Sequence, residues 1–225
     1  MRTKIDINNW GRKLAYQTFS DYKDPYTGIV TELEITKLIK FCKHNELSFY
    51  GCMTYLVLQT MYNINAFKYG YGKENNDEFV YKYDSLAATI TVLTENNELN
   101  FTRYIEFNSE LNDFLCDFNK AKNDAIKSVP YYKISGLENM NKVNITCIPW
   151  ISFSNFKDAI NIDERNSKPK VCWGRFYIKD NEYFINMSLL VNHAFQDGYH
   201  IGLFFNQLQQ SIYNLNNDKY LRKMR

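Results

Sequence analysis

The stretch VNHAFQDGYH, residues 191–200, carries a histidine and an aspartate four residues apart, followed at once by a glycine. It comes directly after a strand-like run over Tyr183–Val191, and it precedes a helical pattern over Gly202–Tyr213. A His at the end of a strand, before a turn that contains Gly, is held on rigid scaffold and opens to a cleft. Neutral imidazole is the usual protein base near pH 7, since its unperturbed pKa is about 6.5. His193 is therefore the first candidate for a catalytic base.

By itself, the spacing His-x-x-x-Asp-Gly is a weak motif, because most bare matches of this kind are structural. We expect Gly198 to break the helical pattern, so that Asp197 does not share a helix face with His193. The expected task of Asp197 is instead to fix the loop through an ion pair or backbone bonds. On the spacing alone, a structural His satisfied within the fold stays the alternative for His193.

Away from this stretch, helical and strand patterns are mixed without strict βαβ alternation. Apolar residues at i, i+3, i+4 and i+7 predict a helix over 35–45, and a helix over 48–62 is apolar nearly all round, which is typical of a buried helix. The other expected elements are a helix over 109–127 and strands over 30–35, 86–93, 99–105 and 171–178. The expected fold class is α/β, with an α+β-type mixed sheet flanked by helices.

The composition is that of one ordinary globular domain. The 225 residues fall below the length of about 250 at which single cores commonly split, so one domain over residues 1–225 is expected. Apolar residues make up 45% of the chain and charged residues 23%, which excludes a disordered or fibrous protein. The net charge of +2 is too small to predict nucleic acid or a membrane surface as a partner.

The cysteines favour free thiols in a reducing compartment, because their number is odd and no pair has metal-ligand spacing. They are Cys42, Cys52, Cys116, Cys147 and Cys172. The first ten residues, MRTKIDINNW, lack the apolar run of a signal peptide, and the apolar-rich run over 49–61 is too short to span a bilayer. We therefore expect a cytoplasmic protein without a metal.

Three blocks of sequence carry a resemblance to a known family. NHAFQDGYHIGLFFNQLQ (192–209) resembles the HHxxxDGxH signature of the chloramphenicol acetyltransferase family and the helix that follows it. TCIPWISF (146–153) is similar to the family's Ser-x-x-Pro-Trp-x-Ser-Phe segment, and NWGRK (9–13) is similar to its N-terminal Trp-x-Arg-Lys. The blocks follow in order along nearly the whole chain, so their combination is far more specific than any one of them.

The resemblance implies the CoA-dependent acyltransferase fold and acetyl transfer from acetyl-CoA to a small hydroxylated acceptor, with chloramphenicol as the first candidate. It implies that His193 takes the proton of the acceptor hydroxyl as that oxygen attacks the thioester. Thr146 would donate to the oxyanion of the tetrahedral intermediate. Asp197 and Arg12 would pair and hold the catalytic loop. The resemblance also implies a homotrimer with its active sites between subunits.

For the coenzyme, the resemblance implies that Trp150 lines its tunnel and that Cys172 is a second coenzyme-binding residue. Cys172 replaces a family threonine whose hydroxyl organises water near the intermediate, and Trp173 adds bulk nearby. Asn192 replaces the first His of the family pair, and Thr146 replaces a Ser with a side chain whose extra methyl restricts χ1. These departures keep two alternatives open: an acetyltransferase with a different hydroxylated acceptor, and a catalytically weak relative that binds CoA or an apolar ligand.

Two plainer interpretations concern the residues beside the chemistry. A Thr in a strand is most often only a strand former, which is an alternative for Thr146. Cys147 and Cys172 suggest a thiol nucleophile, but a buried free Cys is usually inert packing, so this interpretation is disfavoured.

Overall fold

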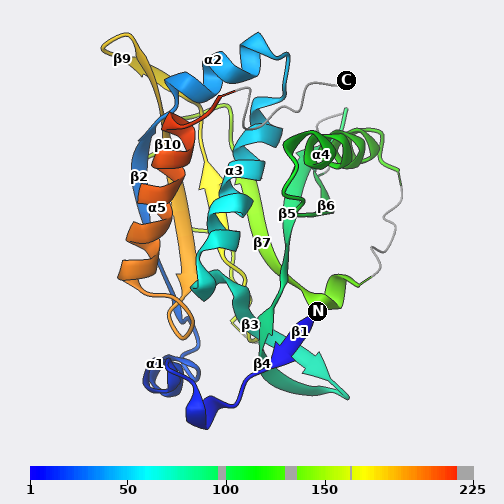
Figure 1. Ribbon diagram of the computed structural model, residues 1–225, viewed down its shortest axis with the longest axis vertical. Coiled ribbons are helices and arrows are strands. Elements are labelled where there is room, and N and C mark those ends of the chain that lie inside the picture. Colours follow the sequence, from blue (N-terminus) through cyan, green and yellow to red (C-terminus); the bar gives the residue numbers. More distant parts are fainter. Residues whose placement is uncertain (96–99, 130–135, 163, 217–225) are drawn as a thin grey trace.

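The computed structural model describes residues 1–95, 100–129, 136–162 and 164–216. Figure 1 shows a large sheet with helices on one side and a smaller sheet at one end. Leu99, the first residue of one expected strand, lies outside the described residues. The single domain expected over residues 1–225 stays a prediction.

The described helices agree in order with the expected ones, apart from a short additional helix near the N-terminus. They are α1 (Lys13–Phe19), α2 (Thr36–His44), α3 (Phe49–Asn63), α4 (Leu111–Ile126) and α5 (Gly198–Tyr213), with 3-10 turns η1 (Ile7–Asn9), η2 (Asn65–Lys68) and η3 (Leu137–Asn139). The described strands are β1 (Arg2–Lys4), β2 (Tyr26–Glu34), β3 (Tyr69–Glu74), β4 (Asp77–Tyr83), β5 (Ser85–Leu93), β6 (Asn100–Glu106), β7 (Met140–Cys147), β8 (Lys170–Trp173), β9 (Tyr177–Lys179) and β10 (Glu182–Asn192).

The large sheet is mixed, as the sequence predicts. Its strand order is β2-β10-β8-β7-β5-β6, and β9 pairs with the first residues of β10. Strands β5, β7 and β8 run parallel, whereas β10 runs antiparallel to both β8 and β2. The C-terminal end of β10 therefore lies at the same end of the sheet as the N-terminal ends of β7 and β8, opposite to their C-terminal ends.

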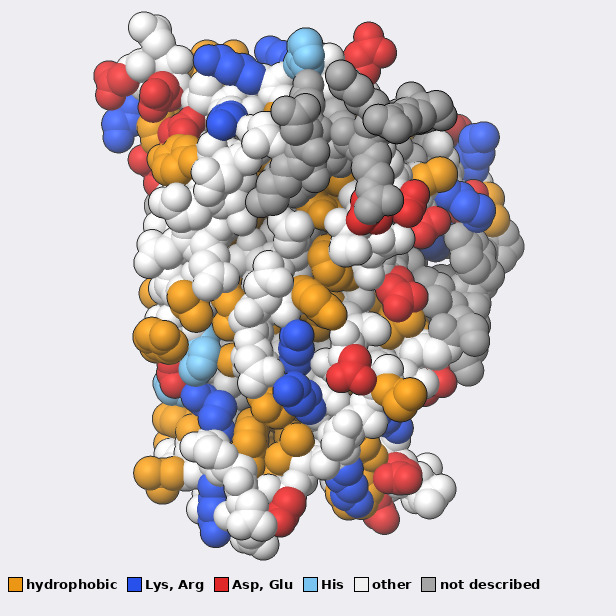
Figure 2. Space-filling model, in the orientation of Figure 1, with side chains coloured by type: hydrophobic (Ala, Val, Ile, Leu, Met, Phe, Trp, Pro, Cys, Tyr) orange, Lys and Arg blue, Asp and Glu red, His pale blue; other side chains and the backbone are white. Residues whose placement is uncertain are grey.

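Helices α2 to α5 cover one face of this sheet, and Figure 1 shows α3 and α5 lying in front of it. Helix α3 is buried nearly all round, as its apolar sequence predicts, and its N-cap is Ser48, whose hydroxyl accepts from the Gly51 amide. On the face shown in Figure 2, basic and acidic side chains of the described residues are interspersed, in line with the small net charge.

The second face of the sheet is crossed by the described residues of the segment over 148–169, between β7 and β8. On β10, Ile185, Met187 and Val191 belong to the core, so strand alternation turns Asn186 and Asn192 to the other face. Both of these asparagines donate their amides to backbone carbonyls of the 148–169 segment.

Two expected boundaries are wrong for identifiable reasons. The strand expected over 171–178 is interrupted after Trp173, where the Arg175 amide donates to the Ile151 carbonyl and Gly174 lies so close to that oxygen that a Cβ would be 2.6 Å from it. The last helix begins at Gly198 and not near Gly202, because Asp197 caps it and accepts from the Tyr199 amide.

The small sheet, in the order β1-β4-β3, is absent from the expected elements. Its β3–β4 hairpin turns on Asn75 and Asn76, both with positive φ, and a pair of asparagines is a recognised signal for such a two-residue turn. The sheet helps to build a second cluster, in which Val80, Ala194 and Phe195 are buried. This cluster packs the stretch after β10, to which Ala194 and Phe195 belong, against the small sheet.

Candidate active site

His193 follows the last residue of β10 and extends the pairing of β10 with β2 by one step. Its backbone amide donates to the Pro25 carbonyl at 2.9 Å. Its imidazole stacks on the Phe19 ring, with centroids 4.0 Å apart and planes 17° apart. Nδ1 is buried and has no hydrogen-bond partner among the described residues, and Nε2 is not one of these buried, unpartnered atoms. Nε2 is therefore the ring nitrogen open to a substrate.

Arg12 and Asp197 form the predicted pair beside His193. Arg12 Nη1 donates to Asp197 Oδ2 at 3.0 Å, and Nη2 donates to the His193 carbonyl at 3.4 Å. His200 Nδ1 lies 2.9 Å from the other oxygen of Asp197. One guanidinium thus ties the main chain of His193 to the start of α5.

The pKa of Asp197 lies below its usual range because of these contacts. Burial alone raises the pKa of this carboxyl, but the hydrogen bond from Arg12 outweighs it, together with the charges of His200 and Arg12. The carboxylate is therefore ionised at neutral pH and acts as a fixed acceptor that anchors the loop.

An aromatic cluster packs under the same loop. Phe195, which is fully buried, meets Tyr71 edge to face with centroids 4.9 Å apart, and it also meets Trp10 and Tyr16. These rings come from the N-terminal segment, α1 and β3. The motif around Trp10 and Arg12 therefore reaches His193 through both packing and charge.

Thr146 and Cys172 lie side by side at the other end of the sheet. They are partners in the parallel register of β7 and β8. Because Ile145 and Val171 are in the core, strand alternation turns Thr146 and Cys172 to the second face. The structure therefore brings together the predicted oxyanion donor and one predicted coenzyme residue.

Trp150 follows directly and is 63% exposed. The next residue, Ile151, accepts from the Arg175 amide at 2.7 Å, which joins the chain after β7 to the chain after β8. Arg175 is itself exposed. Trp150 and Arg175 thus offer a flat aromatic surface and a cation near Thr146, a combination that was not singled out from the sequence.

Trp173 does not stand where its expected effect requires it. It is fully buried on the helix side of the sheet and packs edge to face on Tyr50, with centroids 5.6 Å apart. Strand alternation separates it from Thr146, which lies on the other face. Its bulk therefore fills the core and does not narrow the site.

The thiols near Thr146 are poor nucleophiles. Burial raises the pKa of Cys147 to about 11. Burial raises the pKa of Cys172 to about 12, and the neighbouring Cys147 and Asp158 add to this effect because they disfavour a second negative charge there. Both side chains are therefore thiols at neutral pH, which agrees with the low weight given to a thiol mechanism.

His193 and Thr146 are far apart within one chain. Thr146 is level with Cys172, which is level with Ser188 on β10, and His193 lies five residues beyond Ser188. At about 3.3 Å per residue and about 4.8 Å between strands, the Cα atoms of His193 and Thr146 are roughly 19 Å apart. A base and an oxyanion donor that serve one reacting carbonyl must each lie about 3 Å from it. The two residues of one chain do not share a site.

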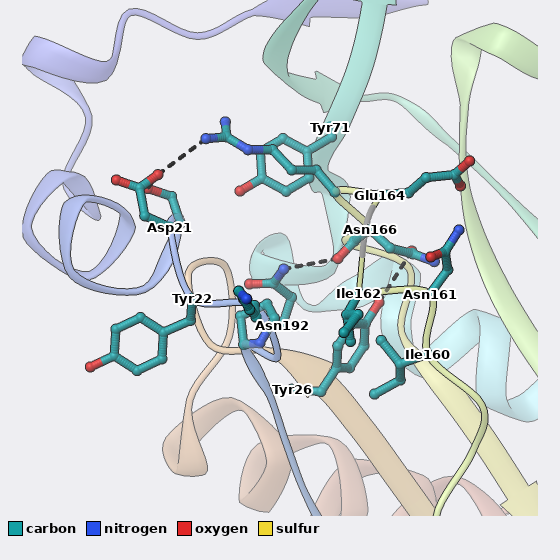
Figure 3. A pocket seen from close by; sticks show the side chains of 14 residues that line it. Asp21, Tyr22, Tyr26, Tyr71, Ile160, Asn161, Ile162, Glu164, Asn166 and Asn192 are labelled. Atoms are coloured by element: carbon teal, nitrogen blue, oxygen red, sulfur yellow. Dashed lines mark hydrogen bonds and ion pairs between the residues drawn. The ribbon is translucent and has the colours of Figure 1, made fainter.

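A cavity of about 240 Å³ adjoins the His193 loop (Figure 3). Tyr26, Tyr71 and Asn192 line it, and residues 160–162 and 164–166 of the segment on the second face form its opposite wall. Pro25, whose carbonyl holds His193, also lines it. The mixed lining of aromatic and polar groups suits a small hydroxylated molecule.

Neither a metal centre nor a membrane span stands out in the part of the chain that the structure describes. No group of three or more His, Cys, Asp or Glu residues there could hold a metal ion. No helix there is long and apolar enough to cross a membrane. The expectation of a metal-free protein stays a prediction.

Sequence comparison gives a match over nearly the whole chain. The family model described as chloramphenicol acetyltransferase matches residues 1–209. A chloramphenicol acetyltransferase of Staphylococcus aureus is 30% identical over 211 residues, covering 92% of this chain and 97% of the relative. One of Clostridium butyricum is 25% identical, covering 93% of this chain and 94% of the relative.

Structural comparison agrees on the fold. A solved chloramphenicol acetyltransferase superposes with a TM-score of 0.80 at 20% identity, covering 94% of this chain and all of that chain. A probable dihydrolipoamide acetyltransferase of Listeria monocytogenes gives a TM-score of 0.60 at 11% identity, covering 95% of this chain and 91% of that chain. The predicted CoA-dependent acyltransferase fold is therefore confirmed.

Proposed function

Because this chain belongs to the chloramphenicol acetyltransferase family, a family of acyltransferases, we propose that it transfers the acetyl group of acetyl-CoA to the primary hydroxyl of chloramphenicol. The observation that carries the proposal is the placement of His193. Its ring is stacked on Phe19 and its loop is clamped by the Arg12–Asp197 pair, which leaves Nε2 as the nitrogen that meets substrate.

In the proposed reaction, His193 is the general base. Nε2 takes the proton of the acceptor hydroxyl as its oxygen attacks the thioester carbonyl carbon, which forms a tetrahedral intermediate. The C–S bond then breaks, and the leaving thiolate takes the proton back from the imidazolium. General base catalysis of this kind typically contributes a factor of about 10²–10⁴ in rate.

Thr146 would supply the hydrogen bond to the oxyanion, a donor that typically contributes a factor of about 10²–10³. Cys172 lies level with it on the neighbouring strand and lines the same face. Trp150 and Arg175 are the exposed aromatic and cationic groups nearest in the chain to this pair, and we assign them to the coenzyme.

We further propose a homotrimer in which His193 of one subunit faces Thr146 of the next. The separation of roughly 19 Å within one chain supports this, since a second copy is needed to bring the two residues to one carbonyl. The exposed apolar side chains of Trp150 and Ile151, close to Thr146, suit burial against a neighbour. We also propose a cytoplasmic location, which five free cysteines favour.

One observation favours a second candidate, the same chemistry on a different hydroxylated acceptor. Lys170 and Cys172 point to the same face of β8, and the Lys170 side chain is only 7% exposed. Its ammonium pairs with Asp158 at 3.2 Å and donates to the Ala159 carbonyl at 2.6 Å. A charged pair near Thr146 and Cys172 suits a polar acceptor better than an apolar one.

The test is the release of CoA thiol from acetyl-CoA, followed in the presence of chloramphenicol. The wild-type protein should release thiol, and His193→Ala should lose at least about 10²-fold of that rate while it stays folded. His44→Ala is the matched control, since His44 is an exposed residue at the end of α2. Equal rates for wild type and His193→Ala would refute the assignment of the base.

Release with a panel of other hydroxylated acceptors, but not with chloramphenicol, would favour the second candidate. Binding of acetyl-CoA without release for any acceptor would leave the third possibility, a relative that binds CoA without turnover.

A further inference from the structure

Asn192, which directly precedes His193, is the least expected residue of the catalytic loop. It is 1% exposed, and an amide side chain is costly to bury unless its hydrogen bonds are made. Here both ends of the amide are used. Oδ1 accepts from the Ala194 amide at 2.9 Å, and Nδ2 donates to the Asn166 carbonyl at 2.9 Å.

The first of these bonds shapes the turn around the base. An Asn that accepts from the amide two residues on forms an Asx-turn, which fixes the backbone of the residue between them. That residue is His193. The backbone carbonyl of Asn192 also accepts from Phe195 and Gln196, so the turn is closed from its first residue.

The second bond ties the turn to the cover of the second face. Asn166 is itself anchored, because its Oδ1 accepts from the Tyr26 hydroxyl at 3.1 Å and from the Lys168 amide at 2.9 Å. Tyr26 is the register partner of Asn192 on β2. Figure 3 shows the Asn192 amide directed at Asn166 across the wall of the cavity.

The Arg12–Asp197 pair does not close the turn around His193 or tie it to Asn166. It holds the carbonyl of His193 and the start of α5, which lie on the C-terminal side of the base. Asn192 is the side chain that links the Ala194 amide to the Asn166 carbonyl across the turn, whereas the Pro25 carbonyl fixes only the His193 amide. Without it, the Ala194 amide and the Asn166 carbonyl each lose a buried partner.

We propose that Asn192 is a positioning residue for His193, which fixes the imidazole by closing the turn around it and tying that turn to Asn166. The proposal deepens the acetyl-transfer function and rests on it for the kinetic measurements only. The orientation of the ring is measurable in protein that turns nothing over.

The test compares Asn192→Ala with Asn186→Ala. Asn186 is a matched control because it lies on the same strand and face, and its amide donates to the Phe153 carbonyl of the same segment at 2.7 Å. It is six residues from Asn192, or about 20 Å along the strand. Asn192→Ala should lower kcat roughly 10- to 100-fold, because a misplacement of about 1 Å can cost that much. The KM for acetyl-CoA should change less than about threefold, because no coenzyme contact is removed.

Nuclear magnetic resonance of histidine-labelled protein supplies the second readout. The chain has only three histidines, so the His193 ring signals are assigned by their loss in His193→Ala. Asn192→Ala should shift or broaden the His193 ring signals, and Asn186→Ala should leave them in place. Should Asn192→Ala fail to fold, Asn192→Ser is used, whose hydroxyl can still accept from Ala194 but is too short to reach Asn166.

Unchanged kcat and unchanged His193 ring signals in the folded Asn192 variant would overturn the proposal. An equal shift or broadening of the His193 ring signals in Asn186→Ala would also overturn it, because both variants would then act through a general loosening of the 148–169 segment. If the wild-type protein transfers no acetyl group, the proposed function fails, and the ring signals alone decide on Asn192.

Discussion

Complementation between two inactive variants tests most directly how the site is assembled. His193→Ala removes the base, and Thr146→Val removes the hydroxyl while it keeps the shape of the side chain. Each variant alone should lose roughly 10²-fold or more of the acetyl-transfer rate. Because the two residues of one chain are roughly 19 Å apart, no active site can draw both from the same subunit.

The magnitude follows from the assembly. In mixed oligomers made from equal amounts of the two chains, a site is intact when its His193 comes from the Thr146→Val chain and its Thr146 from the His193→Ala chain. In a trimer that contains both chains, one of the three sites meets both conditions, so about one third of the sites in doubly tagged protein are wild-type in composition. The doubly tagged protein should therefore recover about one third of the wild-type activity, far above either parent.

The assay is thiol release by chains that are co-expressed with two different tags and purified through both. The control is a mixture of the two proteins made after each has assembled, which contains no mixed oligomers. Light scattering gives the number of subunits, and three is the expected value. Activity of the doubly tagged protein no greater than the mean of its parents would refute the shared site and return Thr146 to the role of a strand former.

Three further predictions follow from the geometry. First, Asp197 has a depressed pKa in the folded protein, so its contribution to stability is present above the unfolded carboxyl pKa of about 3.9 and is lost as pH falls through the folded value. The free energies of unfolding of wild type and Asp197→Asn, measured in urea, should differ at pH 7 and converge in acid. A difference in free energy that does not depend on pH would contradict this. Second, Gly174→Ala should lower the free energy of unfolding by about 1–3 kcal/mol, because its Cβ would meet the Ile151 carbonyl oxygen at 2.6 Å. Gly202→Ala, with open space around its Cβ inside α5, should raise the free energy of unfolding by about 0.5–1 kcal/mol. Thermal unfolding measures both changes, and changes of the same sign would refute the packing argument. Third, Cys172→Thr should raise kcat a few-fold, because a hydroxyl is a better hydrogen-bond donor than a thiol beside Thr146; an unchanged or lower kcat would show that this position does not take part.

Much of the fold was predictable because its signals are local. The helix expected over 48–62 and the strand expected over 86–93 follow from periodicity, and the structure has α3 and β5 there. The β3–β4 hairpin was missed although Asn75 and Asn76 signal its turn. The break at Gly174 was beyond local reasoning, since its cause is the Ile151 carbonyl, which is distant in sequence.

The candidate site divides in the same way. The sequence resemblance implied the pairing of Arg12 with Asp197, and the structure shows that ion pair; the register that sets Thr146 level with Cys172 was not predicted. The stacking of His193 on Phe19 and the two bonds of Asn192 carry no motif, because they depend on where α1 and the 148–169 segment pack. The expectation that Trp173 adds bulk near the site is wrong, because strand alternation turns its side chain to the helix side of the sheet, where it packs on Tyr50.

The polarity of the large sheet is the physical basis of our proposal that acetyl transfer depends on an assembly of subunits. Strand β10 runs antiparallel to β8, which is parallel to β7. His193 therefore lies at one end of the strands, and Thr146 and Cys172 lie at the other end. No change of rotamer or loop spans a distance of roughly 19 Å that is set by rigid strands. A substitution that weakens contacts between subunits must then lower activity even where it touches neither half of the site. Specific activity should therefore fall on dilution below the dissociation constant of the oligomer, while the fold of each chain, whose core includes Met187 and Trp173, persists.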